Sequence, residues 1–310
     1  MCHKMLTSET DRASSSPVQS LPEMSAQLRR KTERMLNEIR SFQRVIVAFS
    51  GGVDSTLVAY LSKLVLQEGA IVATANSPSI PLSELEEAKQ IAEQIGVKQI
   101  IIQTEELEDP NYASNPANRC YFCKKELSQK LKDLASELKI QVLLDGTNAD
   151  DLTGHRPGAA ALSEEGVRRP LAEAGMTKAE VRELSRLLGL PTFDKPSNPC
   201  LSSRVQYGQL ITPEKLSRIE RAEVVIRSLT GVKELRVRDH GNLARIEVGR
   251  EERSLFFNEE LLDRIASSLR ELGFLYVAFD LAGYRSGSMN ELLTPQGKPK
   301  MEIAKTPGES

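Results

Sequence analysis

The 310-residue sequence lacks a long apolar run, a strong charge imbalance and a dense set of cysteines. No stretch is apolar enough to span a membrane, and residues 1–24 have no apolar core of the kind that a signal peptide needs. The net charge of −2 points to neither a nucleic-acid nor a membrane partner. We therefore predict a cytoplasmic protein whose four cysteines stay reduced and form no disulfide framework.

Apolar, β-branched segments alternate with amphipathic ones in the first two thirds of the chain. The apolar runs predict strands at 45–49, 70–75, 98–103 and 141–144. The amphipathic runs predict helices at 25–39, 53–67, 82–95, 124–138 and 177–188, the last with a capping box formed by Thr177 and Glu180. Strands that alternate with helices are typical of an α/β fold with a doubly wound parallel sheet.

The pattern changes after a loop at 192–208 that is rich in Pro, Ser and Asn. The new order is helix 213–228, strands 235–238 and 243–248 with a turn at 239–242, helix 258–272 and strand 276–279. This order predicts a smaller α+β domain. We accordingly expect a disordered leader at 1–24, a first domain at 25–208, the smaller domain at 209–290 and a flexible tail at 291–310.

The most informative motif directly follows the first predicted strand. It reads Ser50, Gly51, Gly52, Val53, Asp54, Ser55. The glycines let the backbone approach an anion, the helix that starts here points N–H groups at it, and the serines add hydroxyl donors. The Lys of a Walker A loop is absent. The motif resembles the PP-loop of the ATP pyrophosphatase superfamily, which holds the β,γ-pyrophosphate of ATP; the alternative is an ordinary strand–turn–helix.

A second nucleotide-binding signal lies at the carboxyl ends of the other strands, where such sheets bind nucleotides. The candidate residues there are Ser77, Gly146, Thr147, Asn148, Asp150 and Arg156. Gly146 allows a close backbone approach, and Arg156 could meet a phosphate. For Mg²⁺, Asp54 and Asp150 are the first candidates, with Glu247 and Glu220 in the second domain also possible. Taken alone, residues 145–151 could be a polar loop with a helix cap.

Three cysteines form another candidate site. Cys120 and Cys123 are spaced C-x-x-C at the start of a predicted helix, and Cys200 lies in the Pro-rich loop. Three thiolates are one short of a closed Cys₄ zinc site but suit a [4Fe–4S] cluster whose open iron could carry a sulfide. We expect Lys124, Lys125 and the helix N-terminus to lower the pKa of the thiols. The alternatives are a redox pair, zinc completed by His or Asp, a single reactive Cys200, and core cysteines.

Charged residues on one predicted hairpin form a fourth candidate site. Arg236 and Arg238 are two apart on a strand and face the same side, as do Arg245 and Glu247 on the partner strand. They could form a solvated face with cross-strand ion pairs, or an anion site beside the third cysteine. Arg285, in a Gly- and Ser-rich loop, is a further candidate for binding phosphate.

Taken together, these motifs resemble those of the LarE family, from about residue 28 to residue 290. The matching motifs are at 50–55, 145–151, 156–158, 199–204, 236–238 and 283–290. Members of this family are ATP-dependent sulfur transferases that make the nickel-pincer cofactor of lactate racemase. The resemblance implies ATP, Mg²⁺ and a pyridinium mononucleotide as the small molecules that the protein binds.

The resemblance also implies the chemistry. A carboxylate of pyridinium-3,5-biscarboxylic acid mononucleotide attacks the α-phosphorus of ATP, pyrophosphate leaves, and a sulfur nucleophile displaces AMP to give a thiocarboxylate. Residues 50–55 and Mg²⁺ would stabilise the leaving pyrophosphate. The catalytic residues would be Cys200, Arg204, Arg236 and Arg238, of which the last two would hold the anionic substrate near the sulfur.

The source of the sulfur divides the family. In one type, the cysteine at the position of Cys200 gives up its own sulfur and becomes dehydroalanine. In the other, three cysteines hold a [4Fe–4S] cluster whose open iron carries sulfide. Because Cys120 and Cys123 accompany Cys200, we favour the cluster type, recharged by a sulfur donor. We also expect a homo-oligomer.

Three other functions remain open at this point. A tRNA-thiolating enzyme of the same superfamily could use the same motifs, although the chain has no evident basic stripe for RNA. An amidating ligase resembling NAD or GMP synthetase would use ammonia and give the cysteines no role. A non-catalytic ATP-binding regulator would bind ATP yet release no pyrophosphate.

Overall fold

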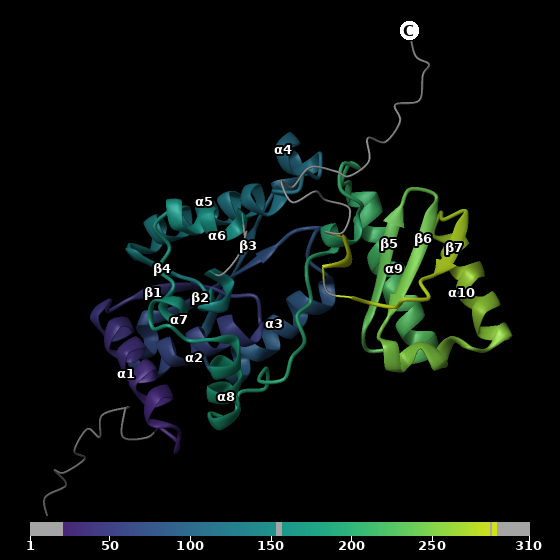
Figure 1. Ribbon diagram of the computed structural model, residues 1–310. Coiled ribbons are helices and arrows are strands. Elements are labelled where there is room, and N and C mark those ends of the chain that lie inside the picture. The colour runs from purple at the N-terminus through teal and green to yellow at the C-terminus, as the bar shows by residue number, and fades with distance from the viewer. Residues whose placement is uncertain (1–20, 153–156, 286, 290–310) are drawn as a thin grey trace, which may run out of the picture.

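A computed structural model describes residues 21–152, 157–285 and 287–289. The larger unit is built on a parallel sheet with strand order β3-β2-β1-β4 (Figure 1). Its strands are β1 (Val45–Ala48), β2 (Ala70–Asn76), β3 (Lys98–Gln103) and β4 (Val142–Leu144). Its helices are α1 (Ala26–Ser41), α2 (Val53–Leu66), α3 (Leu82–Gln94), α4 (Pro110–Ala113), α5 (Arg119–Leu138), α6 (Pro157–Glu164), α7 (Pro170–Glu173) and α8 (Lys178–Leu187).

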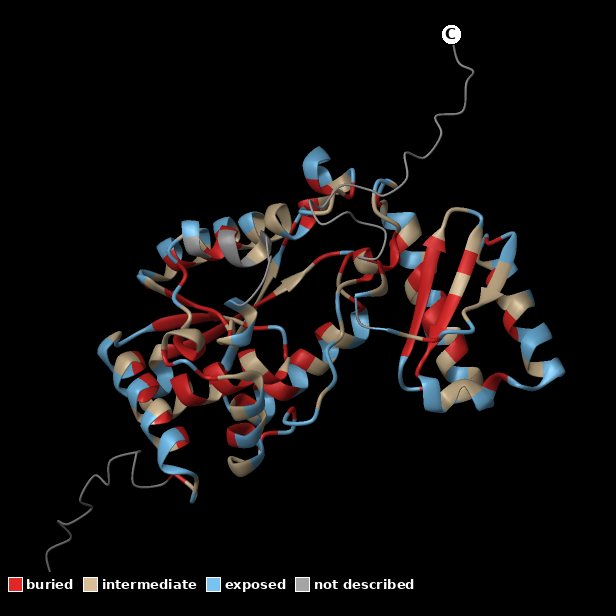
Figure 2. Ribbon diagram, viewed as in Figure 1, coloured by how far each residue is buried: buried red, intermediate tan, exposed pale blue. Residues whose placement is uncertain are grey.

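Helices cover both faces of this sheet, because alternate side chains of each strand point to opposite sides. Val45 and Val47 pack with α1, α2 and α3 in one core cluster, whereas Ile46 packs with α5 in another. Figure 2 shows the strands buried between the two helical layers. The fold is therefore α/β and doubly wound, as the alternation of segments predicts. No helix in the described part of the chain is both long and apolar enough to cross a membrane.

The smaller unit is a three-stranded sheet with two helices on one face. The sheet has the order β5-β6-β7, and β5 and β6 are antiparallel. The elements are α9 (Pro213–Thr230), β5 (Leu235–His240), β6 (Leu243–Val248), α10 (Glu259–Glu271) and β7 (Tyr276–Phe279). Val237 and Ile246 pack toward the helices, as does Asp239, which pairs with Arg218 of α9; Arg236, Arg238, Arg245 and Glu247 lie on the other face. The division of the chain at residue 208 stays a prediction.

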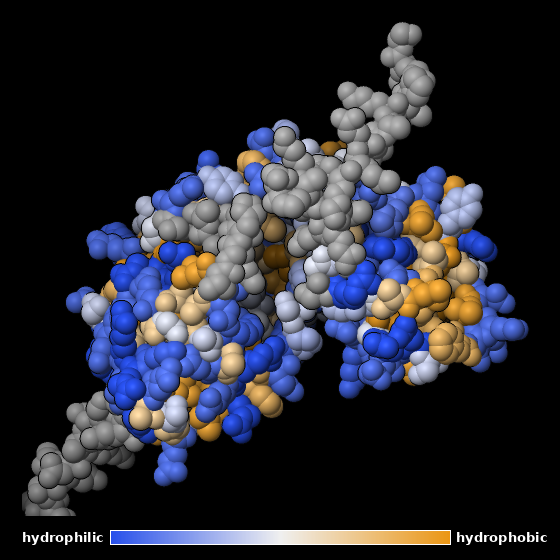
Figure 3. All heavy atoms as spheres, in the orientation of Figure 1, coloured by the Kyte–Doolittle hydropathy of each residue, from blue (hydrophilic) through white to orange (hydrophobic). Residues whose placement is uncertain are grey.

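The surface of the smaller unit is partly apolar. Figure 3 shows hydrophobic side chains gathered on the visible face of this unit, whereas the larger unit is mostly hydrophilic in the same view. Large apolar side chains exposed in the smaller unit include Phe257, Leu275, Tyr276 and Leu281. These residues lie around β7 and the start of α10, at the edge of the sheet away from β5. The apolar surface is therefore at the β7 edge of the sheet, whereas Arg236 and Arg238 lie on β5 at the opposite edge.

Two predicted boundaries differ in ways that affect the site. Helix α5 begins at Arg119 rather than at residue 124, so Cys120 and Cys123 lie within it. Strand β5 continues to His240, because Gly241, with φ of +75°, makes a two-residue turn that lets the ladder run to its end. The short helices α4, α6 and α7 are not foreseen by the sequence pattern. The predicted leader up to residue 20, Cys2 and the tail from residue 290 lie outside the described residues.

The predicted capping box at the start of α8 is confirmed. The Thr177 side chain accepts a hydrogen bond from the Glu180 N–H, and the Glu180 carboxylate accepts one from the Thr177 N–H. We expect Thr177→Ala to lower the free energy of unfolding by about 1 kcal/mol, because the Glu180 N–H loses the hydroxyl that accepts its hydrogen bond and the Glu180 carboxylate loses the hydroxyl that donates to it. Urea unfolding of the two proteins measures this difference. An unchanged midpoint would contradict the prediction.

Candidate active site

The motif at 50–55 forms a turn that opens onto the N-terminus of α2. Gly51 has φ of +67°, and a Cβ there would lie 3.0 Å from the Cα of Ala88, so both conformation and space require glycine. The hydroxyl oxygens of Ser50 and Ser55 lie 3.2 Å apart. No side chain caps α2 at its N-cap residue Gly52. The turn therefore presents backbone N–H groups and two hydroxyls to an incoming anion.

The loop after β4 packs directly against this turn. A Cβ on Gly146 would lie 2.7 Å from the Ser55 backbone nitrogen, which is too close for any other residue. Glycine at this position therefore lets the loop after β4 pack against the glycine turn. The Asn148 side chain donates to Asp54 Oδ1 at 3.0 Å. The Asp145 carboxylate accepts bonds from the N–H and hydroxyl of Thr147. Thr147 and Asn148 thus fix the loop in this structure.

Two lysines that the sequence analysis missed complete this pocket. Lys178, the first residue of α8, forms an ion pair with Asp54, and its N–H donates to Asp150 Oδ2 at 2.8 Å. Lys195 pairs with Glu84 at 3.0 Å. Both lysines line a cavity of about 200 Å³ whose other walls include Ser50, Gly52, Asp54, Ser197 and Asn198. Neither lysine belongs to a recognisable motif, and only the fold brings them to the turn.

The predicted magnesium ligands divide between the two units. Asp54 and Asp150 lie together at the turn, joined through Lys178. Glu247 is buried in the smaller unit, where Arg238 and Arg245 hold its carboxylate. Glu220 reaches the larger unit and accepts a hydrogen bond from the Leu82 N–H at 2.6 Å. Only the first pair is therefore placed to meet a cation bound to the phosphates of a nucleotide.

The structure brings the three cysteines of the predicted site together from remote parts of the chain. Cys123 packs against a buried cluster that contains Leu201, the residue after Cys200. The hydroxyl of Tyr112, on α4, lies 2.7 Å from the Ser202 hydroxyl. Within the described ranges, no three Cys, His, Asp or Glu side chains are arranged as a group that could hold a metal ion. The start of α5 and the Cys200 loop therefore lie against each other, but the three cysteine side chains do not form a metal-binding group.

The expected lowering of the thiol pKa values is wrong. Burial raises the pKa of Cys120, and negative charge on Cys200 adds to it, although the Cys120 side chain reaches solvent. Burial also raises the pKa of Cys123, followed by the effect of Glu106. Lys124 acts in the predicted direction on both thiols but is outweighed. The cost of placing a thiolate among protein atoms therefore exceeds the help from the nearby cations, Arg119 and Lys124 at Cys120 and Lys124 at Cys123.

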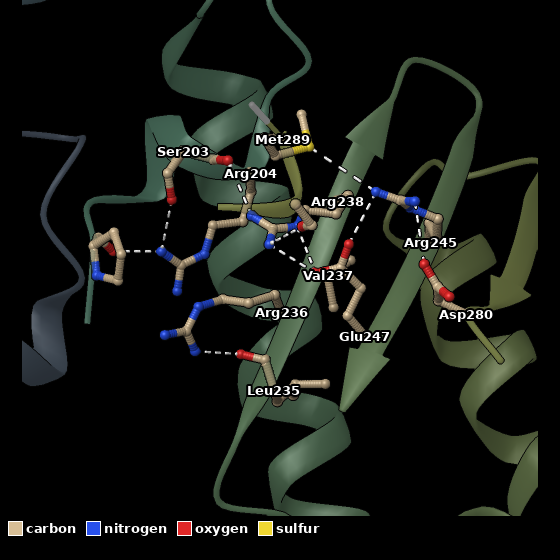
Figure 4. A network of polar contacts seen from close by, with 12 residues as sticks. Ser203, Arg204, Leu235, Arg236, Val237, Arg238, Arg245, Glu247, Asp280 and Met289 are labelled. Carbon is tan, nitrogen blue, oxygen red and sulfur yellow. Dashed lines mark hydrogen bonds and ion pairs between the residues drawn. The ribbon is translucent and has the colours of Figure 1, made fainter. Parts of the chain in front are cut away.

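The predicted arginines lie together beside the Cys200 loop (Figure 4). Arg204 is fully buried, forms an ion pair with Glu223 at 3.0 Å and donates to the Cys200 carbonyl at 3.1 Å. Arg238 donates twice to Glu247, at 2.9 and 2.7 Å. Arg236 is buried too, yet within the described chain it pairs with no carboxylate; it donates to the carbonyls of Leu235 and Ser197. Figure 4 shows its guanidinium beside that of Arg204, directed away from Glu247.

The remaining predicted residues lie farther from these contacts. Ser77 donates to the buried Glu106 carboxylate at 2.7 Å, and it also lines a second cavity of about 370 Å³ at the carboxyl ends of β2 and β3. Arg285 is exposed in the loop after β7. Arg156 lies outside the described residues. Most of the predicted residues thus lie at the glycine turn, at the start of α5, in the Cys200 loop and on β5, and the loop contacts both the turn's pocket and Arg236.

A doubly wound sheet with a glycine turn at the end of its first strand, and no Walker lysine, defines a PP-loop ATP pyrophosphatase fold. The comparisons agree with this class: the family described as NAD synthase matches residues 26–122. An uncharacterized protein of Synechocystis sp. is 48% identical over 84% of this chain and 99% of its own length.

A pyridinium-3,5-bisthiocarboxylic acid mononucleotide synthase of Lactiplantibacillus plantarum is 38% identical over 87% of this chain and 97% of its own length. A glutamine-hydrolyzing GMP synthase of Aeropyrum pernix is 26% identical over 59% of this chain and 39% of its own length. The match to the GMP synthase covers only part of each protein, whereas the match to the mononucleotide synthase spans nearly the whole length of that relative. The chain therefore belongs to the LarE family.

Proposed function

We propose that this protein is an ATP-dependent sulfur transferase that converts the carboxylates of pyridinium-3,5-biscarboxylic acid mononucleotide to thiocarboxylates. One observation carries the proposal: a single loop forms a wall of the pocket at the glycine turn and also carries Cys200. Ser197 and Asn198 line that pocket, and the Asn198 side chain bonds both to Glu84 on α3 and to Arg204. Activation by ATP and delivery of sulfur can therefore occur at adjoining positions.

The pocket at the turn suits the pyrophosphate of ATP. Its backbone N–H groups, two serine hydroxyls and two lysines would stabilise negative charge as pyrophosphate leaves. Asp54 and Asp150 would hold Mg²⁺, which would neutralise the phosphate oxygens. Before Asp54 can bind Mg²⁺, Lys178 must leave Asp54 and pair with a phosphate oxygen instead. The Lys178–Asp54 ion pair is partly exposed, so it is weak enough to be replaced in this way.

The arginines of β5 would bind the anionic pyridinium mononucleotide. Arg238 is already neutralised by Glu247, whereas Arg236 has donors available for a carboxylate or phosphate. Arg236 reaches the Ser197 carbonyl in the pocket wall, so an anion bound there would lie between the turn and Cys200. The substrate carboxylate would attack the α-phosphorus from this position.

Sulfur would then displace AMP from the acyl-adenylate. A carbon–sulfur bond forms, the bond from the acyl carbon to the phosphate oxygen breaks, and AMP leaves with the electron pair. Three thiolates are the ligand type of a [4Fe–4S] cluster with one open iron, and Cys120, Cys123 and Cys200 would turn their side chains toward one point to hold it, with the open iron binding sulfide. Arg204 would keep Cys200 in place through its bond to the Cys200 carbonyl.

One assay tests the proposed function. Protein purified without oxygen is mixed with ATP, Mg²⁺ and the biscarboxylate mononucleotide, and AMP, pyrophosphate and thiocarboxylate are followed by mass spectrometry. We expect one AMP for each thiocarboxylate formed. Pyrophosphate release that depends on ammonia and yields an amide would instead establish the amidating ligase, and sulfur found only in added tRNA would establish a tRNA-thiolating enzyme. Formation of a homo-oligomer stays a prediction.

Arg236 offers the most direct test of the substrate site. We expect Arg236→Met to raise the KM for the mononucleotide about 10- to 100-fold, because a charge-assisted bond to a substrate anion is lost. The KM for ATP should change less than about twofold, since the pocket at the turn keeps its donors. Arg250→Met, at an exposed arginine of the same unit, is the matched control. Equal effects on both substrates would contradict this assignment.

A further inference from the structure

Tyr284 is an aromatic residue beside the charged face of β5 and β6 that the mechanism above does not use. The guanidinium carbon of Arg236 lies 5.0 Å from the centre of its ring. At this distance a cation is attracted to the electron-rich face of an aromatic ring. Arg236 is only 5% exposed, so little water competes with this attraction. The ring is therefore one of the groups that hold the arginine to which we assign the substrate anion.

The backbone fixes the position of Tyr284 relative to β5. Its N–H donates to the Val248 carbonyl at 2.8 Å, and Val248 is paired with Leu235, the residue before Arg236. Gly283 precedes it with φ of +73°, and a Cβ there would lie 2.8 Å from the same carbonyl oxygen. Glycine therefore lets the segment after β7 approach the end of β6 closely enough to bring the Tyr284 ring to Arg236.

The other arginines beside this face are held in a different way. Each forms an ion pair with a carboxylate (Figure 4): Arg204 with Glu223, Arg238 with Glu247, and Arg245 with Glu247 and Asp280. In the described part of the chain, Arg236 is held instead by two backbone carbonyls and the Tyr284 ring. A carboxylate would cancel the charge of the guanidinium and repel an incoming anion, whereas carbonyls and a ring orient the guanidinium and leave its charge uncompensated.

We propose that Tyr284 is a positioning residue that holds the Arg236 guanidinium ready for the anionic mononucleotide without neutralising it. This inference rests on the proposed function, which assigns Arg236 to the substrate. The ring restricts the side chain of Arg236 before the substrate arrives, so less conformational freedom is lost on binding. Without the ring, the arginine would adopt the binding-competent orientation for a smaller fraction of the time, and the apparent affinity for the mononucleotide would fall by the same factor.

Binding of the biscarboxylate mononucleotide without ATP, measured by isothermal titration calorimetry, tests this role. We expect Tyr284→Leu to raise the Kd about 5- to 30-fold, the range for loss of one desolvated cation–π contact. Tyr284→Phe keeps the ring and should stay within about twofold of the unaltered protein. Tyr276→Leu, at a tyrosine of β7 that is 67% exposed, is the matched control and should leave the Kd unchanged.

A double-mutant cycle separates positioning from a general loss of structure. In Arg236→Met the ring has no guanidinium to hold, so the added change Tyr284→Leu should raise the Kd by less than about twofold further. Losses that multiply in the double variant would show that the two residues act independently, and they would overturn the proposal.

The contact between the two side chains can be tested without any ligand. Phenylglyoxal modifies arginine side chains, and peptide mapping gives the rate of modification at Arg236. We expect Tyr284→Leu to raise this rate at least about fivefold, because the ring no longer shields and stabilises the guanidinium, whereas Tyr284→Phe should leave the rate unchanged.

An unchanged rate at Arg236 in Tyr284→Leu would overturn the contact, and a raised rate with an unchanged Kd would overturn its role in binding the substrate. Absence of thiocarboxylate from an unaltered protein that binds the mononucleotide would instead contradict the proposed function, and the Kd values would still report on Tyr284. Failure of the unaltered protein to bind the mononucleotide would overturn both. Circular dichroism of each variant confirms that the comparison is made on folded protein.

Discussion

Cys200→Ser should abolish thiocarboxylate formation, with a loss of at least about a thousandfold, because an alcohol neither supplies sulfur nor ligates iron as a thiolate does. Adenylation should survive, since the pocket at the glycine turn contains no cysteine among its lining residues. ATP–pyrophosphate exchange in the presence of the mononucleotide measures the first step, and mass spectrometry of the thiocarboxylate measures the second. Loss of both steps together would show that Cys200 supports the fold rather than the transfer of sulfur.

The other two cysteines separate the possible sulfur sources. If the three thiols hold a cluster, anaerobic reconstitution should give about four irons per chain and a broad absorption near 400 nm, and Cys120→Ser or Cys123→Ser should remove both. If Cys200 donates its own sulfur, those two variants should remain active. The unaltered protein should then stop after one transfer and lose the mass of H₂S. Turnover beyond one equivalent excludes the second scheme.

Glu223→Gln should destabilise the protein by about 3–5 kcal/mol, because it removes the charge that compensates the fully buried Arg204. The same carboxylate accepts the Val237 N–H at 3.1 Å, so the change also weakens the link between α9 and β5. Since Arg204 donates to the carbonyls of Pro199 and Cys200, thiocarboxylate formation should fall with stability. Equilibrium unfolding in urea measures the first effect.

A neighbouring glutamate on the same helix provides the control. Glu220 accepts one hydrogen bond from the Leu82 N–H at the start of α3, and a glutamine can accept the same bond. Glu220→Gln should therefore cost less than about 1 kcal/mol. If both variants unfold at the same urea concentration, the Arg204–Glu223 pair does not stabilise the region around Cys200.

Features that depend on neighbours in the chain could be predicted from the sequence. The alternation of apolar and amphipathic segments gives the parallel sheet, and the glycine turn follows from its place after β1. Thr177 and Glu180 form the predicted capping box because both partners lie within one turn. Arg236 and Arg238 share a face because side chains alternate along a strand.

Features that depend on remote contacts could not be predicted. Lys178 and Lys195 join the pocket only because α8 and the following loop return to the turn. Asn115, just before α5, is bonded to residues 205 and 206, a contact that no local pattern reveals. The predicted sign of the thiol pKa shifts is wrong because burial depends on the packed fold, whereas the nearby lysines are visible in the sequence.

The loop between Lys195 and Arg204 has a consequence for attempts to alter substrate preference. Its side chains contact α3, the glycine turn and α9 through separate bonds, so it has no freely variable stretch. Libraries that randomise this loop will change nucleotide affinity and sulfur chemistry together, and improvements in one will come with losses in the other. Changes at the exposed residues around β7 and α10 should be tolerated without disturbing catalysis, but they lie at the sheet edge away from β5 and would leave the choice of acceptor acid unaltered.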